Sequence, residues 1–255
     1  MLISTVHNIF SLSLTNEQSK KIGQLVWNNE CQGKTEQLIV WREGEHCASL
    51  GIGHCIWYPA HAHQNFRQSF PELIKFLKNQ KVKLPTWLAR NIKQPCPWKT
   101  KAEFDLAKKK SDKRIVDLQK LLVQTIDYQV AYMVHRLEQL MQGLRKGLYP
   151  HKYHVYKQYE RMISTPEGMF ALVDYLNFKG DGISSSEAYQ GHKWGLVSVL
   201  EHMSGTSHDI NAVHEFVRIA DMVLTTRVVY APSPEVEQKW LPGWRNRIYR
   251  YPTTL

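Results

Sequence analysis

A glutamate at the end of a predicted helix is the first residue that could do chemistry. The helix is predicted to begin at Thr15, because Thr15 and Gln18 form a capping-box pair and apolar residues then recur at helical spacing. Glu30 therefore falls in the last turn of this helix. The negative end of the helix dipole lies there and favours the protonated form of a carboxyl group. Glu30 is thus a candidate general acid.

The segment that follows this glutamate is predicted to be a short β-hairpin. Two runs of strand-forming residues, 37–41 and 47–52, flank a turn that contains a glycine. Alternation along the second run places Glu45 and Ser49 on the same face, and Glu43 lies in the turn. The hairpin therefore brings further carboxylates and a hydroxyl group close to the helix end.

This set of residues fits the cleavage of a glycosidic bond. That reaction needs a carboxylic acid to protonate the leaving oxygen, and commonly a second group that positions a water or stabilises charge on the sugar. Glu30 suits the first role. Glu45 or Glu43, together with Ser49, suits the second, and the sequence leaves open which glutamate it is.

The order of these features resembles the phage-type lysozymes, or endolysins, and the wider lysozyme superfamily. The residues 51–54 read Gly-Ile-Gly-His and match the family motif letter for letter, and Ser49 stands where those enzymes carry Thr. The family's catalytic Asp falls on Glu43, whose side chain is one methylene longer, and Glu45 is the competing candidate. By this resemblance Glu30 is the catalytic acid.

The resemblance that carries these motifs covers residues 15–58. The segments 194–196 and 240–247 are also similar to uncharacterised bacterial envelope proteins associated with the superfamily. The resemblance implies an α+β fold, mostly helical, with a small antiparallel β-hairpin sheet beside the catalytic helix end. It implies a muramidase-type glycoside hydrolase that acts on peptidoglycan glycan strands of the cell wall, in the periplasm or after secretion, with neither metal nor cofactor.

Two other functions remain open. A lytic transglycosylase uses one glutamate as acid and then as base while the sugar's own hydroxyl attacks, so Glu30 alone would suffice. In the superfamily's transglycosylase branches a Gly-Leu turn lines the glycan groove, which makes Trp194 a candidate for substrate binding. A non-catalytic peptidoglycan-binding envelope protein would keep the fold without the chemistry, and a salt bridge of Glu30, for instance with Lys34, would favour it.

Other candidate substrate-binding residues follow from side-chain chemistry. Aromatic rings stack on the apolar faces of sugars, and amides and amines bind their hydroxyl and acetamido groups. The candidates next to the hairpin are His54, Trp57 and Tyr58, and those before a Gly-rich loop are Asn177 and Lys179. The competing interpretation for Trp57 and Tyr58 is a hydrophobic wedge that packs the hairpin on the helical body. For Asn177 and Lys179 it is an ordinary helix end.

Neither a metal site nor a definite disulfide is predicted. His54, His61 and His63 could share one face, but no further ligand follows at a characteristic spacing. The sequence has four cysteines and no Cys-x-x-Cys pair, and it leaves open whether they are buried free thiols or form disulfides: Cys31, Cys47, Cys55 and Cys96.

Composition indicates a globular protein with an anionic partner. The formal net charge is +10 and the pI is about 9.4, and three anionic partners fit this charge: peptidoglycan with its peptide carboxylates, nucleic acid and acidic lipid surfaces. No nucleic-acid-binding motif is present, and no apolar run approaches the roughly 18–20 residues of a membrane span. Residues 1–14 lack a basic start and a small-x-small cleavage site, so we expect an N-terminal arm rather than a signal peptide.

The chain shows no clear domain boundary. Apolar residues step by three or four over residues 111–144, which predicts one long helix at the centre of the fold. We therefore expect a single lysozyme-like domain over residues 1–255. The catalytic helix and hairpin would occupy 15–58, and a helical body 111–255.

Overall fold

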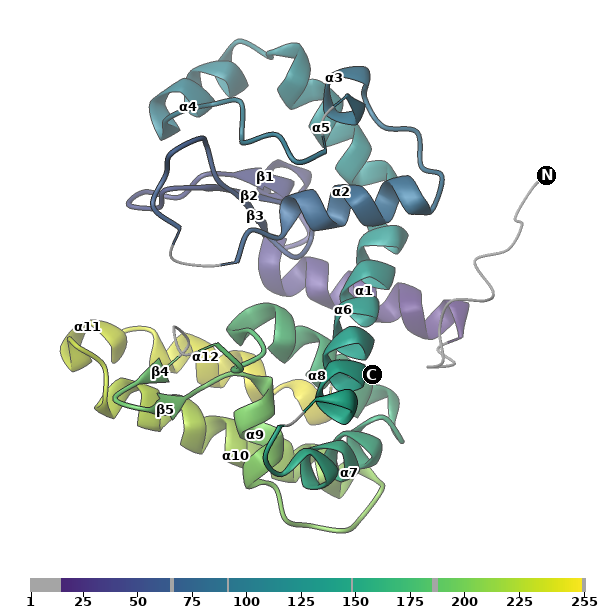
Figure 1. The fold of residues 1–255 in the computed structure, drawn as a ribbon, viewed down its shortest axis with the longest axis vertical. Helices are drawn as coiled ribbons and strands as arrows, with labels where there is room; N and C mark the ends of the chain where they lie inside the picture. Colours follow the sequence, from purple (N-terminus) through teal and green to yellow (C-terminus); the bar gives the residue numbers. More distant parts are fainter. Residues whose placement is uncertain (1–14, 65–66, 91, 148, 185–187, 254–255) are drawn as a thin grey trace. The chain divides into compact units, whose positions relative to one another are not determined.

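The computed structural model describes residues 15–64, 67–90, 92–147, 149–184 and 188–253 (Figure 1). The expected N-terminal arm over residues 1–14 lies outside this part. The chain divides into two compact units, Met1–Tyr132 (unit 1) and Met133–Leu255 (unit 2). The boundary falls inside a helix, and the expected single domain stays a prediction.

Unit 1 combines helices with a three-stranded antiparallel sheet in the order β1-β2-β3. Ile39 pairs with Leu50 across the first two strands, and Ser49 pairs with Ile56 across the second and third. Helix α2 contacts β3, and α5 contacts both β1 and η1. The elements are α1 (Asn16–Cys31), the 3-10 helix η1 (Thr35–Leu38), β1 (Ile39–Val40), β2 (Ala48–Leu50), β3 (Cys55–Trp57), α2 (Phe70–Asn79), α3 (Thr86–Ala89), α4 (Lys101–Lys109), α5 (Lys113–Gln124) and the start of α6 (Ile126–Lys146).

Helix α1 begins and ends where the sequence predicts. The backbone N–H of Gln18 donates to Thr15 Oγ1 over 3.1 Å, and the N–H of Thr15 donates to Gln18 Oε1 over 2.9 Å. The helix ends at Cys31, because Gln32 takes a left-handed conformation with φ of 53°. The predicted position of Glu30 in the last turn is therefore confirmed.

The predicted continuous helix over residues 111–144 is wrong, because Thr125 separates α5 from α6. Thr125 has φ of −118° and ψ of 20°, which interrupts the helix. Side chains take up carbonyl groups near the break: Thr125 Oγ1 donates to Leu121 O over 2.8 Å, and Gln129 Nε2 donates to Leu122 O over 2.7 Å. Polar side chains inside the apolar stripe thus divide it into two helices.

Gln129 also joins this break to the segment after β2. Its Oε1 accepts from the backbone N–H of Ile52 over 2.9 Å, and the side chain is buried. Replacing Gln129 by Ala leaves Ile52 N–H and Leu122 C=O without these partners, so we expect the free energy of unfolding to fall by about 2–3 kcal/mol. Urea unfolding measures the change. The exposed Gln124 is the matched control, and a loss below about 1 kcal/mol for Gln129→Ala would contradict the expectation.

Unit 2 is built around α10, which contacts α7, α8, α9, α11, α12, η3 and β5. The remainder of α6 belongs to this unit. Figure 1 shows α10 among these helices, with the short β4-β5 hairpin beside it. Its further elements are α7 (Lys152–Met162), α8 (Pro166–Lys179), β4 (Ala188–Tyr189), β5 (His192–Lys193), α9 (Leu196–His202), α10 (Ile210–Val229), α11 (Pro234–Glu237), α12 (Leu241–Ile248) and η3 (Tyr251–Thr253).

The fold class is α+β and mostly helical, as predicted. The predicted hairpin gains a third strand, and the second small sheet was not predicted. Within the described ranges, no helix has the length and apolar character needed to cross a membrane.

All four cysteines are buried, and none forms a disulfide. Burial raises the pKa of Cys31 and Cys96 to about 12 and that of Cys47 to about 11, from an ordinary value of 9.0. Because only the thiolate is nucleophilic, we expect a disulfide reagent such as DTNB at pH 8 to react with the folded protein no faster than it unfolds.

The reaction should become fast in concentrated urea, where the thiols regain their ordinary pKa. The raised thiol pKa values also lower the free energy of unfolding as the pH rises above about 9, since the unfolded chain then loses thiol protons that the folded chain keeps. Rapid labelling of even one thiol in the folded protein would contradict this prediction.

Candidate active site

Glu30 and His54 contact each other at the end of α1. Glu30 Oε2 lies 3.3 Å from His54 Nδ1, and the two side chains are only 13% and 10% exposed. His54 comes from the turn after β2, where its backbone N–H donates to Gly51 O over 3.1 Å. The structure therefore brings together the predicted acid and the histidine of the Gly-Ile-Gly-His motif.

The turn that carries His54 is held in an unusual backbone conformation. Gly51 has φ of 78°, and a Cβ at this position would collide with Gln129 Oε1. The N–H of Gly51 donates to Leu38 O over 2.8 Å, which ties the turn to η1. His54 itself has φ of 46°, a conformation that residues other than glycine seldom adopt. The imidazole is thus placed against α1 by a turn that needs glycine at its first position.

The partners of the imidazole ring place a proton on Nε2. Nε2 is 3.1 Å from Gln37 O, and a carbonyl oxygen can only accept, so Nε2 carries a proton. Cys31 Sγ lies 3.6 Å from the same nitrogen. Arg42 Nη2 is 3.4 Å from Nδ1, and a guanidinium can only donate. Both ring nitrogens of His54 therefore have polar partners within the hairpin and the end of α1.

The same nitrogen, Nδ1, faces Glu30 Oε2. The contact places a shielded carboxyl group 3.3 Å from a ring nitrogen that can accept or donate a proton. A carboxyl group that can exchange its proton is what general acid catalysis requires.

The two other predicted carboxylates are exposed. Strand β2 begins at Ala48, so Glu45 lies in the preceding loop and does not share a strand face with Ser49, which corrects the prediction. Glu43 is 93% exposed, and its Oε2 lies 3.6 Å from Lys101 Nζ. Ser49 is 7% exposed in the central strand of the sheet.

The aromatic residues after the hairpin belong to the core of unit 1. Trp57 and Tyr58 are 1% and 2% exposed, which corrects the expectation that their rings stack on sugars. Trp57 packs against Phe70 with ring centroids 4.7 Å apart, and its Nε1 donates to Gln94 O over 2.9 Å. The hydrophobic wedge is therefore the interpretation that holds for both residues.

The predicted binding residues Asn177, Lys179 and Trp194 lie in unit 2. Lys179 is buried, and its Nζ lies 3.3 Å from the ring centroid of Trp244. Trp194 is buried as well, with its ring 4.6 Å from that of Tyr189. Burial corrects the expectation of a substrate contact for both. Asn177 is partly exposed near the end of α8, and its role stays a prediction.

Two neighbours of His54 were not predicted as parts of the site. Arg42 stands in the predicted turn, where its charge was a visible signal, but only the folded turn shows that it reaches His54 Nδ1. Cys31 follows the candidate acid directly in sequence, and only the fold shows that its Sγ lies beside His54 Nε2.

Comparisons of the chain with models of protein families, with curated proteins and with solved structures returned no match.

Proposed function

We propose that this protein cleaves the β-1,4 links between the aminosugars of peptidoglycan glycan strands, with Glu30 as the general acid. The contact between Glu30 and His54 carries the proposal, because it places a shielded carboxyl group at a helix end beside an imidazole with which it can exchange a proton. The resemblance of Glu30, the hairpin and the motif at 51–54 to the lysozyme superfamily supports the same chemistry.

The exposed positions of Glu43 and Glu45 support a reaction with one essential carboxylate. Glu30 first donates its proton to the leaving oxygen. As a carboxylate it then takes the proton from the sugar's own hydroxyl group, which attacks the anomeric carbon and closes a 1,6-anhydro ring. This is the reaction of a lytic transglycosylase. The hydrolytic alternative uses Glu43 or Glu45 to position a water, which requires a carboxyl separation of about 6.5–9.5 Å.

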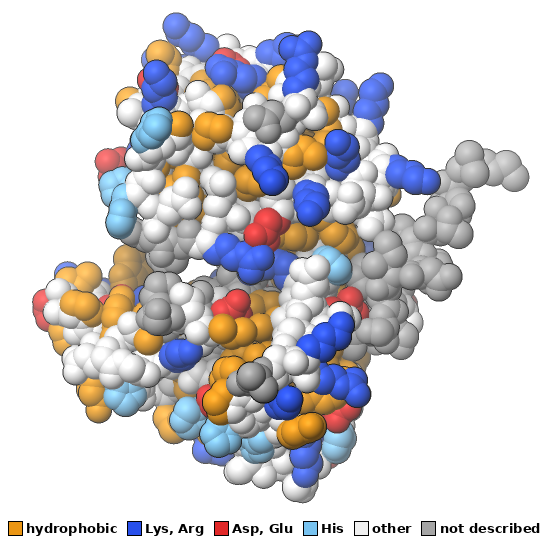
Figure 2. Space-filling model, viewed as in Figure 1, with side chains coloured by type: hydrophobic (Ala, Val, Ile, Leu, Met, Phe, Trp, Pro, Cys, Tyr) orange, Lys and Arg blue, Asp and Glu red, His pale blue; other side chains and the backbone are white. Residues whose placement is uncertain are grey.

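The charge of the chain fits this substrate. The formal net charge is +10, and Figure 2 shows Lys and Arg side chains over the visible faces of both units. The stem peptides of peptidoglycan carry carboxylates, so long-range attraction would favour the encounter. Because peptidoglycan lies outside the cytoplasmic membrane, we propose that the protein acts in the periplasm or after secretion.

A second candidate function is non-catalytic binding of peptidoglycan. This function is favoured if the contact between Glu30 and His54 is a structural ion pair, in which His54 is protonated and Glu30 is ionised. In that state Glu30 has no proton to give to a leaving group.

Mass spectrometry of the fragments released from purified sacculi separates these functions. We expect the wild-type protein to release muropeptides with 1,6-anhydro ends and the Glu30→Gln variant to release none. Reducing ends from the wild type would indicate a hydrolase instead. If the wild type releases no fragments but sediments with the sacculi, the enzymatic proposal is wrong and the binding function remains.

A further inference from the structure

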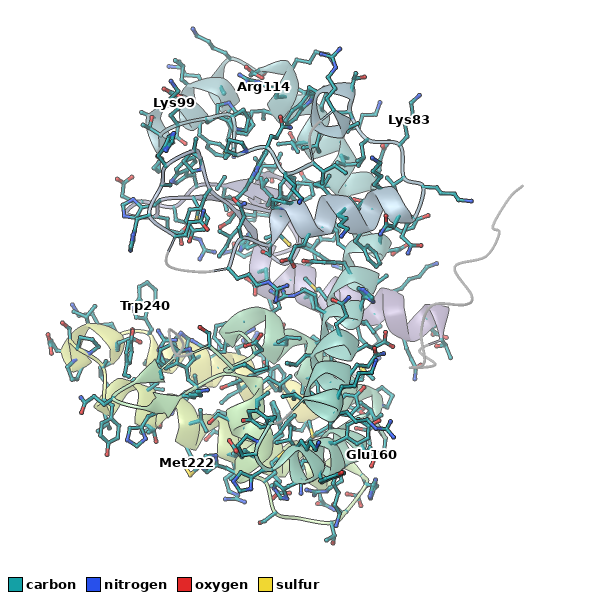
Figure 3. All side chains as sticks on the ribbon, viewed as in Figure 1. Lys83, Lys99, Arg114, Glu160, Met222 and Trp240 are labelled. Carbon is teal, nitrogen blue, oxygen red and sulfur yellow. The ribbon has the colours of Figure 1, made fainter. Side chains whose placement is uncertain are left out.

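Trp240 differs from the other tryptophans of this chain. All eight tryptophans lie in the described part, and Trp240 alone is exposed, with 62% of its surface accessible. Figure 3 shows its side chain projecting from the start of α12, clear of the ribbon. The other seven indoles are at least partly buried, so Trp240 is the tryptophan whose ring is accessible to a ligand.

Gly243 lies one helical turn after Trp240 and has no internal reason to be glycine. It is the third residue of α12 and follows Pro242 in the first turn of that helix. A Cβ at this position would meet nothing within 4 Å, and no positive φ requires glycine there. Side chains on a helix lean toward its N-terminus, so a side chain at 243 would extend toward Trp240. Because glycine has no side chain, the helix backbone at position 243 is left uncovered beside the indole.

The chemistry around this surface suits a sugar ring. A pyranose has a flat apolar face that can stack on an indole and a polar edge that hydrogen-bonds to side chains. Gln238 and Lys239, both exposed, precede Trp240 and supply an amide and an amine, and the amine also suits the carboxylates of stem peptides. Trp240 alone does not account for a stable protein interface, because one indole buries only about 150–250 Å² whereas such interfaces bury about 1,200–2,000 Å².

We propose that Trp240 and Gly243 form a glycan-binding platform on unit 2, on which an aminosugar ring stacks against the indole and lies across the bare turn of α12. The occupant rests on the proposed function, which supplies the glycan strand as substrate. The platform adds a binding site that none of the sequence-predicted residues provides.

Binding is best measured with the catalytic glutamate removed, so that the ligand stays intact. In the Glu30→Gln protein, titration calorimetry with the β-1,4-linked tetramer of N-acetylglucosamine should show that Trp240→Ala weakens affinity about tenfold. Val229→Ala, which shortens another exposed apolar side chain of unit 2, is the matched control and should leave affinity unchanged.

Gly243→Ala separates a binding role from a structural one. A methyl group in open space improves helix propensity, so this variant should raise the urea midpoint of unfolding while it weakens binding of the tetramer at least threefold. Unchanged affinity in Trp240→Ala or in Gly243→Ala would overturn the platform. Binding that depends on Trp240 for anionic phospholipid vesicles, but not for the tetramer, would also overturn it.

The cleavage assay on the wild-type protein keeps the two proposals apart. If the wild type releases no fragments from sacculi while the tetramer still binds through Trp240, the enzymatic function fails and the platform stands. If the wild type cleaves and Trp240→Ala binds the tetramer normally, the platform alone fails.

Discussion

Replacing Asp174 by Asn should lower the free energy of unfolding of unit 2 by about 3–5 kcal/mol, because it leaves a largely buried guanidinium without its counter-charge. Asp174 is fully buried in α8 and accepts hydrogen bonds from Arg247 and Tyr251. Arg247 donates to it through Nε over 2.7 Å and through Nη2 over 2.8 Å, and the Tyr251 hydroxyl donates over 2.7 Å. Urea unfolding followed by circular dichroism measures the loss.

A surface ion pair supplies the matched control. Glu43→Gln removes the charge that faces Lys101, but Glu43 is 93% exposed, so the expected change in unfolding free energy is below about 1 kcal/mol. In the double variant Asp174→Asn/Arg247→Met, the unpaired charge is gone, and we expect part of the stability to return. If Asp174→Asn unfolds within 1 kcal/mol of the wild type, the buried pair contributes little.

The contacts of Asp174 also mark the limit of prediction from sequence. The start of α1 was predictable because it depends on neighbouring residues: the Thr15 side chain accepts a hydrogen bond from Gln18 in the first turn, as the capping-box pattern indicates. Asp174 and Arg247 are 73 positions apart, and no local pattern pairs a charge in one helix with a charge in another. The mostly helical α+β class follows from local signals, whereas the network that joins α8 to α12 does not.

Gln129 shows the same limit inside a periodic segment. The apolar stripe over residues 111–144 predicts one helix, and a single polar residue within it carried little weight. In the folded chain Gln129 helps to divide the stripe and holds Ile52 from 77 positions away. A buried polar side chain that serves the backbone of a distant segment cannot be distinguished from a surface residue by spacing alone.

The candidate site was predictable in part for similar reasons. Glu30 was placed by helix signals, and His54 by its motif, so both positions depend on short-range patterns. For the predicted binding residues that prove to be buried, the role depended on exposure, which short-range patterns do not give. Trp57 has the side chain of a sugar-binding residue but lies in the core, whereas the exposed Trp240 is not among the predicted binding residues. Residue type indicates which chemistry is possible, and burial decides which residues are accessible for it.

The rate of glycan cleavage should depend on the carboxyl group of Glu30. Glu30→Gln should lower the rate of fragment release from sacculi by about 10²–10⁴-fold, because glutamine keeps the shape of the side chain but has no carboxyl proton to donate. Glu43→Gln and Glu45→Gln should each retain the wild-type rate within about threefold, since both side chains are exposed outside the strands. Initial rates of turbidity loss in a sacculus suspension provide the comparison.

Two controls make this comparison decisive. Each variant should sediment with sacculi as the wild type does, which shows that lost activity is not lost binding, and its circular dichroism spectrum should match that of the wild type. If Glu43→Gln or Glu45→Gln is as slow as Glu30→Gln, a second carboxylate takes part and the single-carboxylate reaction is wrong. If Glu30→Gln keeps the wild-type rate, Glu30 is not the acid, and its contact with His54 serves the structure of the turn rather than proton transfer.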